Sequence, residues 1–404
     1  MVDLSAVKVR IDAVVDEHAE VLLDASHRIH AHPELGFQEH HAHEVLTTVL
    51  ADAGLDVTPG AYGLDTAFEA TAKGGDGPTV AVMCEYDALP GIGHACGHNI
   101  IGTAGVGAGI AAAAVVAELG GNLVVLGSPA EEGGGGKVLM AERGAFEGVD
   151  AALMVHPAGM DLARFGAIAI QQVEVTYTGR AAHAAAAPQA GRNALDAAVL
   201  GYVNVAALRQ HIRPDERIHG IFTEAGDAAN VVPDHAAATW YVRSPTAKGL
   251  GKLKARVLAC LEAGATAAGC GMEHRWIDPA FANMVDNDPM IERYRVNLAR
   301  TGRTLLDPDS MAEIVGSTDM GNVSHIVASI HPMIAVSPPT VAIHTKDFVR
   351  YAGGAEGDRA VVDGAKALAA TVADLWGEPG AIDEVRAAFT AARETGQATG
   401  RATL

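Results

Sequence analysis

A cysteine and a histidine stand two residues apart in a loop that is rich in glycine. Cys96 and His98 belong to the string CEYDALPGIGHACGHN, which follows an apolar run. Thiolates and imidazoles are ligands that borderline-soft metal ions prefer, and glycines let backbone and ligands crowd around an ion. The spacing therefore indicates a pair of metal ligands. The structural alternative is a buried cysteine beside a hydrogen-bonded histidine.

Two adjacent glutamates, Glu131 and Glu132, follow a second apolar run at residues 122–126. Two neighbouring carboxylates that leave a strand cannot both be buried without partners. One of them can bind a metal ion while the other accepts a proton as a general base. The alternative is a pair of solvated glutamates. The flanking residues SPA and GGGG favour the metal interpretation, because such a loop allows a ligand to approach closely.

His156 follows a third apolar run at residues 151–155, and His344 is a further candidate in the C-terminal segment AIHTKDF. We expect the first three groups to lie beyond strand ends at one edge of an open sheet, where sites form in α/β proteins. Six other histidines have no acidic or thiolate partner at a fixed spacing. We expect surface or structural roles for these six: His27, His30, His32, His40, His41 and His43.

Alternating strands and helices predict an α/β domain whose mixed, parallel-rich sheet has helices on both faces. We expect helices at residues 3–31, 39–54, 137–143 and 357–376, and strands at 67–72, 79–84, 122–126 and 151–155. The first two strands are expected to form a pair. The glycines between residues 102 and 109 are explained by close helix packing, because no strand directly precedes them as a dinucleotide site requires.

The pattern changes near residue 168 and returns near residue 280. Between these points the order is strand, helix, strand, strand, helix, strand, which is the ferredoxin-like arrangement. We therefore predict a discontinuous catalytic domain at 1–167 and 281–404, with a small α+β domain inserted at 168–280.

Composition excludes some classes of function. The 404 residues include 29 basic and 49 acidic side chains, for a net charge of −20, which argues against binding of nucleic acid. The four cysteines form no disulfide framework, so we expect reduced thiols and a cytoplasmic location. The apolar run at residues 101–119 is rich in glycine and alanine, and we expect a buried helix there and no membrane span.

The chain resembles the aminoacylase/carboxypeptidase family of dinuclear-metal amidohydrolases over essentially its full length. Within that family it is most similar to the subgroup of p-aminobenzoyl-glutamate hydrolase and the β-alanyl-lysine-type dipeptidases. The resemblance rests on HPELGFQEHHA, EYDALPGIGHACGHN, PAEEGGGGK, VHP, GRAAHAA, ANVVPD and GSTDMGNVS. The second string is highly specific, and the short ones are specific only in this order.

The resemblance implies two divalent metal ions, zinc or manganese foremost, with cobalt and nickel as alternatives. Cys96 would bridge them as a thiolate, and the remaining ligands would be His98, Glu132, His156 and His344. Glu131 would be the general base that acts on the metal-bridging water. Many relatives have His-x-Asp where this chain has Glu85-Tyr86-Asp87. That departure assigns the ligand role to His98, leaves Asp87 to orient a ligand, and leaves open whether Glu85 touches the site.

The resemblance also implies that the inserted domain is a lid that forms a homodimer. His183 would reach the partner subunit's site and help to hold the oxyanion, while Asn230 and Arg243 would bind the substrate carboxylate. The implied activity is hydrolysis of an amide bond in an N-acyl amino acid or a dipeptide-like substrate, with an N-substituted glutamate as the alternative. Two rivals remain: a thiol enzyme with Cys96 as nucleophile, and a non-catalytic homologue that binds metal or peptide.

Overall fold

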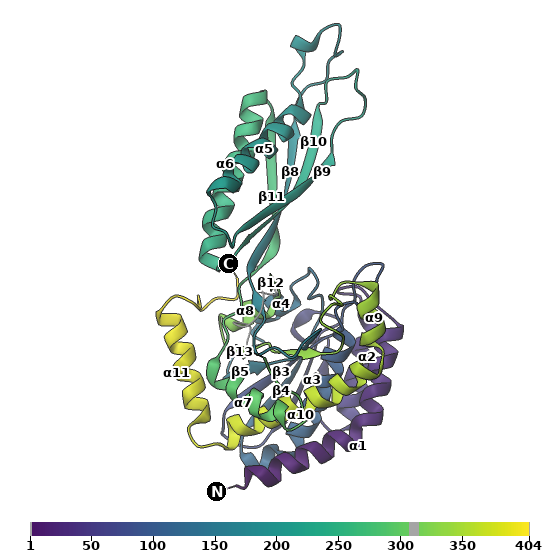
Figure 1. Ribbon diagram of the computed structural model, residues 1–404, viewed down its shortest axis with the longest axis vertical. Coiled ribbons are helices and arrows are strands. Elements are labelled where there is room, and N and C mark those ends of the chain that lie inside the picture. Colours follow the sequence, from purple (N-terminus) through teal and green to yellow (C-terminus); the bar gives the residue numbers. More distant parts are fainter. Residues whose placement is uncertain (1, 307–314, 404) are drawn as a thin grey trace. The chain divides into compact units, whose positions relative to one another are not determined.

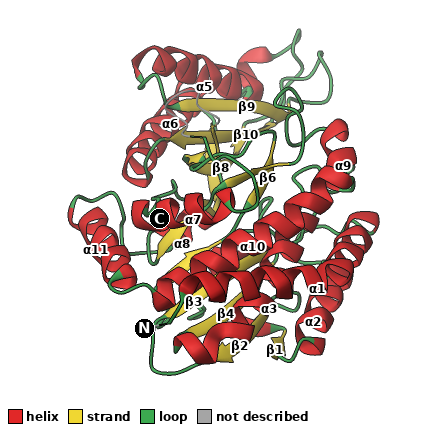
Figure 2. Cartoon of the chain, turned by 60° about the horizontal axis from the view of Figure 1, so that its bottom comes forward, coloured by secondary structure: helices red, strands yellow, loops and turns green. Residues whose placement is uncertain are grey.

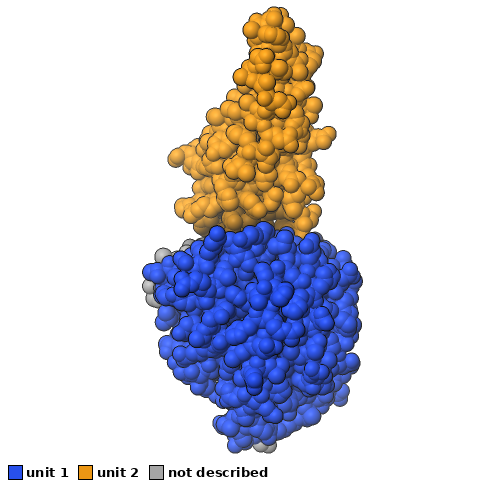
Figure 3. Space-filling view, turned by 90° about the vertical axis from the view of Figure 1, so that its right-hand side faces the viewer, with its two compact units in different colours: residues 1–166, 284–402 blue, residues 167–283, 403–404 orange. Residues whose placement is uncertain are grey.

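The computed structural model describes residues 2–306 and 315–403. The chain separates into two compact units, which Figure 3 shows in different colours. Unit 1 comprises residues 1–166 and 284–402, and unit 2 comprises residues 167–283 with 403–404. The segment between the two parts of unit 1 is the one in which the sequence predicts an inserted domain, at 168–280.

A mixed six-stranded sheet forms the centre of unit 1 (Figure 1). Its order is β1-β2-β4-β3-β5-β13, from β1 (Asp56–Pro59), β2 (Phe68–Lys73), β4 (Asn122–Ser128), β3 (Thr79–Glu85), β5 (Ala151–Leu153) and β13 (Ala328–Ile330). The predicted pairing of β2 with β3 is wrong, because β4 lies between them, antiparallel to β2 and parallel to β3. The helix that follows β3 returns the chain beside that strand, as a βαβ unit requires, so β2 pairs with the outer side of β4.

Helices cover both faces of this sheet, as the sequence predicts (Figure 2). One face packs on α1 (Leu4–Ala31), α2 (His40–Asp52), α3 (His98–Leu119), α7 (Asp288–Ala299) and α10 (Ala355–Gly377). The other face packs on α4 (Gly136–Glu142) and α8 (Met320–Ser324). The alternation along β3 explains the two layers: Val80, Val82 and Cys84 belong to the first core, while Ala81 and Met83 belong to the second.

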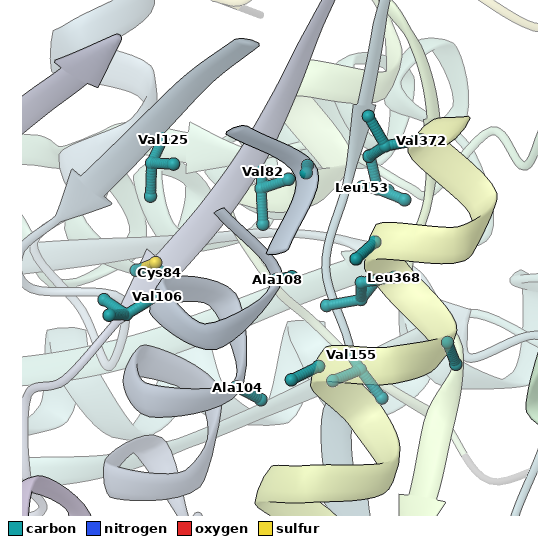
Figure 4. Packing of buried hydrophobic residues seen from close by; sticks show 14 of the residues in the cluster. Val82, Cys84, Ala104, Val106, Ala108, Val125, Leu153, Val155, Leu368 and Val372 are labelled. Carbon is teal, nitrogen blue, oxygen red and sulfur yellow. The ribbon is translucent and has the colours of Figure 1, made fainter. Parts of the chain in front are cut away.

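Helix α3 is the core helix of unit 1 and packs against the sheet and helices α1 and α10. Figure 4 shows its Ala104, Val106 and Ala108 among side chains of the sheet and of α10. A Cβ atom at Gly105 would lie 2.5 Å from the Cys84 sulfur, and one at Gly109 would lie 2.4 Å from Val125. Its glycines therefore permit the close approach to β3 and β4 that the sequence predicts. Among the described residues α3 alone is long and apolar enough to span a bilayer, but 83% of that stretch is buried inside the protein.

The chain after β5 departs from the prediction. The sequence places His156 at the end of a strand, whereas β5 stops at Leu153 and His156 begins a short new strand, β6 (His156–Ala158). This strand pairs in parallel with β14 (Met333–Ala335). The backbone N–H of His156 donates to the carbonyl of Pro332 at 2.9 Å. Backbone hydrogen bonding therefore passes here from the pair β5–β13 to the pair β6–β14. Two further helices, α9 (Lys346–Ala352) and α11 (Ala381–Glu394), follow near the C-terminus.

Unit 2 has the predicted ferredoxin-like order of elements. Its antiparallel sheet runs β11-β8-β10-β9, from β11 (Gly271–Phe281), β8 (Ala169–Thr178), β10 (His235–Ser244) and β9 (Arg217–Glu224). Helices α5 (Ala194–Leu208) and α6 (Ala247–Ala268) pack on one face. Val173, Val175 and Tyr177 alternate along β8 toward these helices and form much of the core of the unit.

Candidate metal centre

The loops that carry the candidate ligands meet because the strands before them are parallel. β3 pairs in parallel with both β4 and β5, and Glu85 at the end of β3 lies opposite Ser128 at the end of β4. The loops that leave these strands therefore start at one edge of the sheet. α3 begins at His98, which places Cys96 in the turn just before a buried helix.

Among the described residues of unit 1, four sets of three side chains could hold a metal ion; two contain Glu131, and two share Cys96. The two that share Cys96 are Cys96, His98 and His156, and Cys96, Glu132 and His344; within each set the ligand atoms all lie within 4.8 Å of one another. The sulfur of Cys96 lies 3.4 Å from Nε2 of His156. Nε2 of His344 lies 3.5 Å from Oε1 of Glu132. Because the sulfur belongs to both sets, two ions could share it.

Asp87 fixes the imidazole of His98. Oδ1 of Asp87 lies 3.0 Å from Nδ1 of His98, and Oδ2 accepts a hydrogen bond from the backbone N–H of Glu132 at 3.0 Å. This contact turns Nε2 of His98 toward the glutamates, 3.9 Å from a carboxylate oxygen of Glu131 and 3.9 Å from one of Glu132. A carboxylate that orients a histidine in this way is common behind metal-binding imidazoles.

The buried polar atoms at this site fit a metal ion. Nε2 of His98 and Oε1 of Glu132 are buried, and neither has a hydrogen-bond partner among the described residues. Burying such atoms without a partner is unfavourable, and a bound metal ion would supply the partner that both lack. The donors present, one thiol, three imidazoles and one carboxylate, suit zinc and its neighbours in the first transition row. The residues present therefore fit divalent metal ions.

Protonation states support this interpretation. Burial lowers the pKa of His156 to about 3, and Nδ1 of its neutral ring donates to the carbonyl of Pro157 at 2.8 Å, which leaves the lone pair of Nε2 facing Cys96. Burial, followed by the charge of Glu132, raises the pKa of the Cys96 thiol well above its ordinary value. A thiol with a raised pKa is a poor nucleophile by itself, whereas a bound cation favours its thiolate.

Glu131 is a buried carboxyl group beside the two ligand sets. It follows β4 by three residues and is 7% exposed. Burial raises its pKa well above the ordinary value, and the neighbouring charges of Glu85 and Glu132 add to the effect. A carboxylate whose pKa is shifted upward is a stronger base, which suits a general base.

A buried lysine that the sequence does not single out connects two acidic residues behind the site. The ammonium of Lys137 forms ion pairs with Glu85 and with Oδ1 of Asp319, the latter at 2.7 Å, and all three side chains are fully buried. Although burial alone would lower it, the charges of Asp319 and Glu85 raise the pKa of Lys137. One oxygen of Glu85 is thus bound to Lys137, and the other lies 3.8 Å from Nε2 of His98.

His331 is a second residue that the sequence does not single out. Its imidazole is buried with neither nitrogen hydrogen-bonded among the described residues, and its ring centre lies 5.3 Å from that of His156. The sequence did contain a signal for His331, because a His-Pro pair follows each of the parallel neighbours β5 and β13. The six other histidines join no possible metal-ligand group in the part of the chain that the structure describes.

Three predicted site residues belong to unit 2. His183 and Asn230 are neighbours, since the backbone N–H of Ala184 donates to the carbonyl of Asn230 at 3.0 Å. Arg243 lies near the opposite end of β10, which begins at His235. Eight residues of extended strand span roughly 25 Å. Asn230 and Arg243 of a single subunit therefore lie toward opposite ends of β10, and their binding of a substrate carboxylate stays a prediction.

Comparisons with known proteins agree on one family. The sequence model described as "Peptidase family M20/M25/M40" matches residues 81–374. The chain is 37% identical to the Xaa-Arg dipeptidase of Mus musculus, over 96% of this chain and 93% of the relative. It is 34% identical to a component of the p-aminobenzoyl-glutamate hydrolase of Escherichia coli (strain K12), over 69% of this chain and 62% of the relative.

Solved structures share the fold at lower identity. A dinuclear metal binding peptidase of the M20 family from Bacillus subtilis is 20% identical, with a TM-score of 0.66 over 88% of this chain and 98% of its own. The aminobenzoyl-glutamate utilization protein from Klebsiella pneumoniae is 20% identical, with a TM-score of 0.68 over 90% of this chain and 98% of its own. Both support the assignment of fold.

Proposed function

We propose that this chain, which belongs to peptidase family M20/M25/M40, is a two-metal hydrolase that cleaves the amide bond of a dipeptide or an N-acyl amino acid. The observation that carries the proposal is the pair of ligand sets that share Cys96, with Glu131 beside them. Identities of 37% and 36% with the Xaa-Arg dipeptidases of mouse and human, each over 96% of this chain, favour a dipeptide.

The proposed ligands divide between two ions. Cys96, His98 and His156 would hold one, and Cys96, Glu132 and His344 would hold the other. Zinc, manganese, cobalt and nickel are all compatible with these donors. When bound, such ions lower the pKa of a water molecule and polarise an amide carbonyl.

The protein's own part in the proposed reaction is to orient groups and to move a proton. Glu131 accepts a proton from the attacking water and passes it to the leaving nitrogen, a task that its raised pKa favours. Asp87 holds the His98 ring, and the carbonyl of Pro157 holds the His156 ring, so both imidazoles present a fixed nitrogen.

We further propose that unit 2 joins two copies of the chain and closes as a lid. β9 is an edge strand whose Ile221 and Phe222 are 67% and 38% exposed, which suits pairing with a second copy. His183 would serve the partner's site, and Asn230 and Arg243 would bind the substrate carboxylate. Light scattering tests the dimer: Ile221→Lys is expected to shift the protein toward monomer. We also propose a cytoplasmic location, which suits four free cysteines.

The substrate is tested by a hydrolysis panel with metal add-back. The panel contains Xaa-Arg dipeptides, N-acetyl amino acids and p-aminobenzoyl-glutamate, the last because of the 34% identity with that hydrolase. We expect the highest kcat/KM for a dipeptide. A preference for p-aminobenzoyl-glutamate would establish the second candidate, an N-substituted glutamate hydrolase. The absence of metal-dependent hydrolysis across the panel would favour a non-catalytic binding protein.

A further inference from the structure

The turn HPELGFQE, residues 32–39, supplies none of the proposed ligands, yet it contacts two loops of the centre. The backbone N–H of Ala88 donates to the carbonyl of Glu34 at 2.8 Å. The backbone N–H of Ala130 donates to Oε1 of Glu39, also at 2.8 Å. The turn therefore ties the loop of Asp87 to the loop that carries the proposed base.

Ala130, directly before Glu131, has an unusual backbone conformation. Its φ is 56°, in the left-handed region that residues with a Cβ atom rarely adopt. The direction in which Glu131 leaves the backbone depends on this conformation, because the two residues share a peptide plane. Relaxation of Ala130 to a negative φ would redirect the Glu131 carboxylate.

Packing and hydrogen bonds around Ala130 oppose that relaxation. A Cβ atom at Gly36 would lie 2.7 Å from the Ala130 methyl group, and one at Gly134 would lie 2.6 Å from it, so the methyl group fits only because both neighbours are glycine. The carbonyl of Ala130 accepts hydrogen bonds from the N–H groups of Gly134 and Gly135 at 2.9 and 2.8 Å. Glu39 supplies the side-chain contact to its N–H group.

Glu39 is itself held in place. Its side chain is fully buried, and Oε2 accepts a hydrogen bond from the hydroxyl of Thr66 at 2.8 Å. Both carboxylate oxygens thus have a partner on a different part of unit 1. A buried carboxylate is unfavourable unless it is well bonded, so its position is sharply defined by these two contacts.

We propose that Glu39 is a positioning residue that holds Ala130 in its left-handed conformation and thereby aims the Glu131 carboxylate. The inference rests on the proposed role of Glu131. The carboxylate of Glu39 bonds to Ala130 and Thr66, and neither is a proposed ligand, so its effect is expected on the chemical step. Loss of the contact should lower kcat and leave KM and metal content unchanged.

The test compares Glu39→Ala with Glu39→Gln in the metal-loaded, full-length protein. Glu39→Ala should lower kcat by about 10- to 100-fold, since misplacing a catalytic group by about 1 Å has effects of this size. Glu39→Gln should stay within about threefold of wild type, because an amide oxygen can accept from Ala130 while its NH₂ group donates to the Thr66 hydroxyl. Ala130→Gly should restore part of kcat in the Glu39→Ala background, because glycine adopts a positive φ without strain.

Glu34→Ala is the matched control. The carboxylate of Glu34 accepts from the N–H groups of His41 and Ala42 at the start of α2, within the same turn but away from Ala130. The Glu34→Ala substitution should lower the melting temperature and leave kcat unchanged. Wild-type kcat in Glu39→Ala, equal losses of kcat in Glu39→Ala and Glu34→Ala, or a failure of Glu39→Gln to restore activity would each overturn the inference.

Glu131→Gln separates this inference from the proposed function. If Glu131→Gln abolishes hydrolysis while Glu39→Ala does not, the positioning role of Glu39 fails and the role of Glu131 stands. If Glu131→Gln hydrolyses at the wild-type rate, the proposed base is wrong and the role of Glu39 falls with it.

Discussion

Replacement of Lys137 by methionine removes the cation from a fully buried network. The Lys137 ammonium lies between the carboxylates of Glu85 and Asp319, with 0% exposure for all three side chains. Methionine has a similar length and no charge, so the perturbation is mainly electrostatic. Two carboxylates then face each other without the ammonium that joined them.

The size of the effect follows from this burial. Removing one partner of a buried ion pair destabilises a protein by about 3–5 kcal/mol, because a buried charge is left unpaired. Burial raises the pKa of Asp319 to about 6 even with Lys137 present, and loss of the ammonium removes the charge that lowers it. Asp319 can therefore take up a proton and relieve the repulsion. The loss of stability should be larger at pH 8 than at pH 6.

The assay must report on unit 1 alone, because a chain with two units need not unfold in one step. Trp376 lies in unit 1, while Trp240 and Trp276 lie in unit 2. Urea unfolding is therefore followed by fluorescence in a W240F/W276F background, with chelator present so that metal binding does not contribute. In this background the free energies of unfolding of the lysine variant and its parent are compared at pH 6 and pH 8.

Lys366→Met is the matched control. Lys366 pairs with Asp16 at 2.6 Å, and their side chains are 18% and 59% exposed. An ion pair with one partner this exposed contributes about 0–1 kcal/mol to stability, so the control substitution should change the free energy of unfolding little. If Lys137→Met lowers the free energy of unfolding no more than Lys366→Met does, or by the same amount at both pH values, Lys137 is not the charge that balances the buried carboxylates.

Three further predictions concern the centre and its support. Asp87→Asn should weaken metal binding about 10- to 100-fold in competition with a chromogenic chelator, because one amide cannot accept from both His98 and the N–H of Glu132; unchanged affinity would contradict that role. Burial raises the pKa of Glu39, so the folded protein binds this proton more tightly than the unfolded chain and loses stability as pH rises above about 4.5. Glu39→Gln has no such proton to lose. Its free energy of unfolding minus that of the wild type, measured in chelator, should therefore increase from pH 5 to pH 8. A difference that stays constant or falls would contradict a raised pKa of Glu39. Bound metal should protect Cys96 from iodoacetamide while chelator abolishes hydrolysis; full activity in chelator would favour the thiol enzyme.

The meeting of the three loops that carry the candidate ligands was predictable from the sequence. Apolar runs ending in Glu85, Ser128 and Leu153 form parallel neighbours, and parallel strands present their carboxyl ends at one edge. The order of elements in unit 2 was predictable for a similar reason, since alternation and turn residues mark each short strand. In both cases a local pattern suffices because the connections follow general rules of chain topology.

Contacts between distant segments could not be predicted in this way. Lys137 and Asp319 are 182 residues apart, and nothing in the spacing of either indicates that they meet. The left-handed conformation of Ala130 could not be predicted either, because alanine gives no signal for a positive φ. The two glycines that make room for its methyl group, Gly36 and Gly134, are not adjacent to it in the sequence. The start of β6 at His156 depends on pairing with β14, far along the sequence.

The central claim is that two ions held through Cys96, together with Glu131 as the base that takes a proton from the attacking water, perform the hydrolysis. Metal-free wild-type and Glu131→Gln proteins are titrated with zinc or manganese while bound metal and substrate turnover are measured on the same samples. The account predicts two ions per chain in both proteins and turnover in the wild type only. Turnover by Glu131→Gln at the wild-type rate, or full wild-type activity without bound metal, would contradict it.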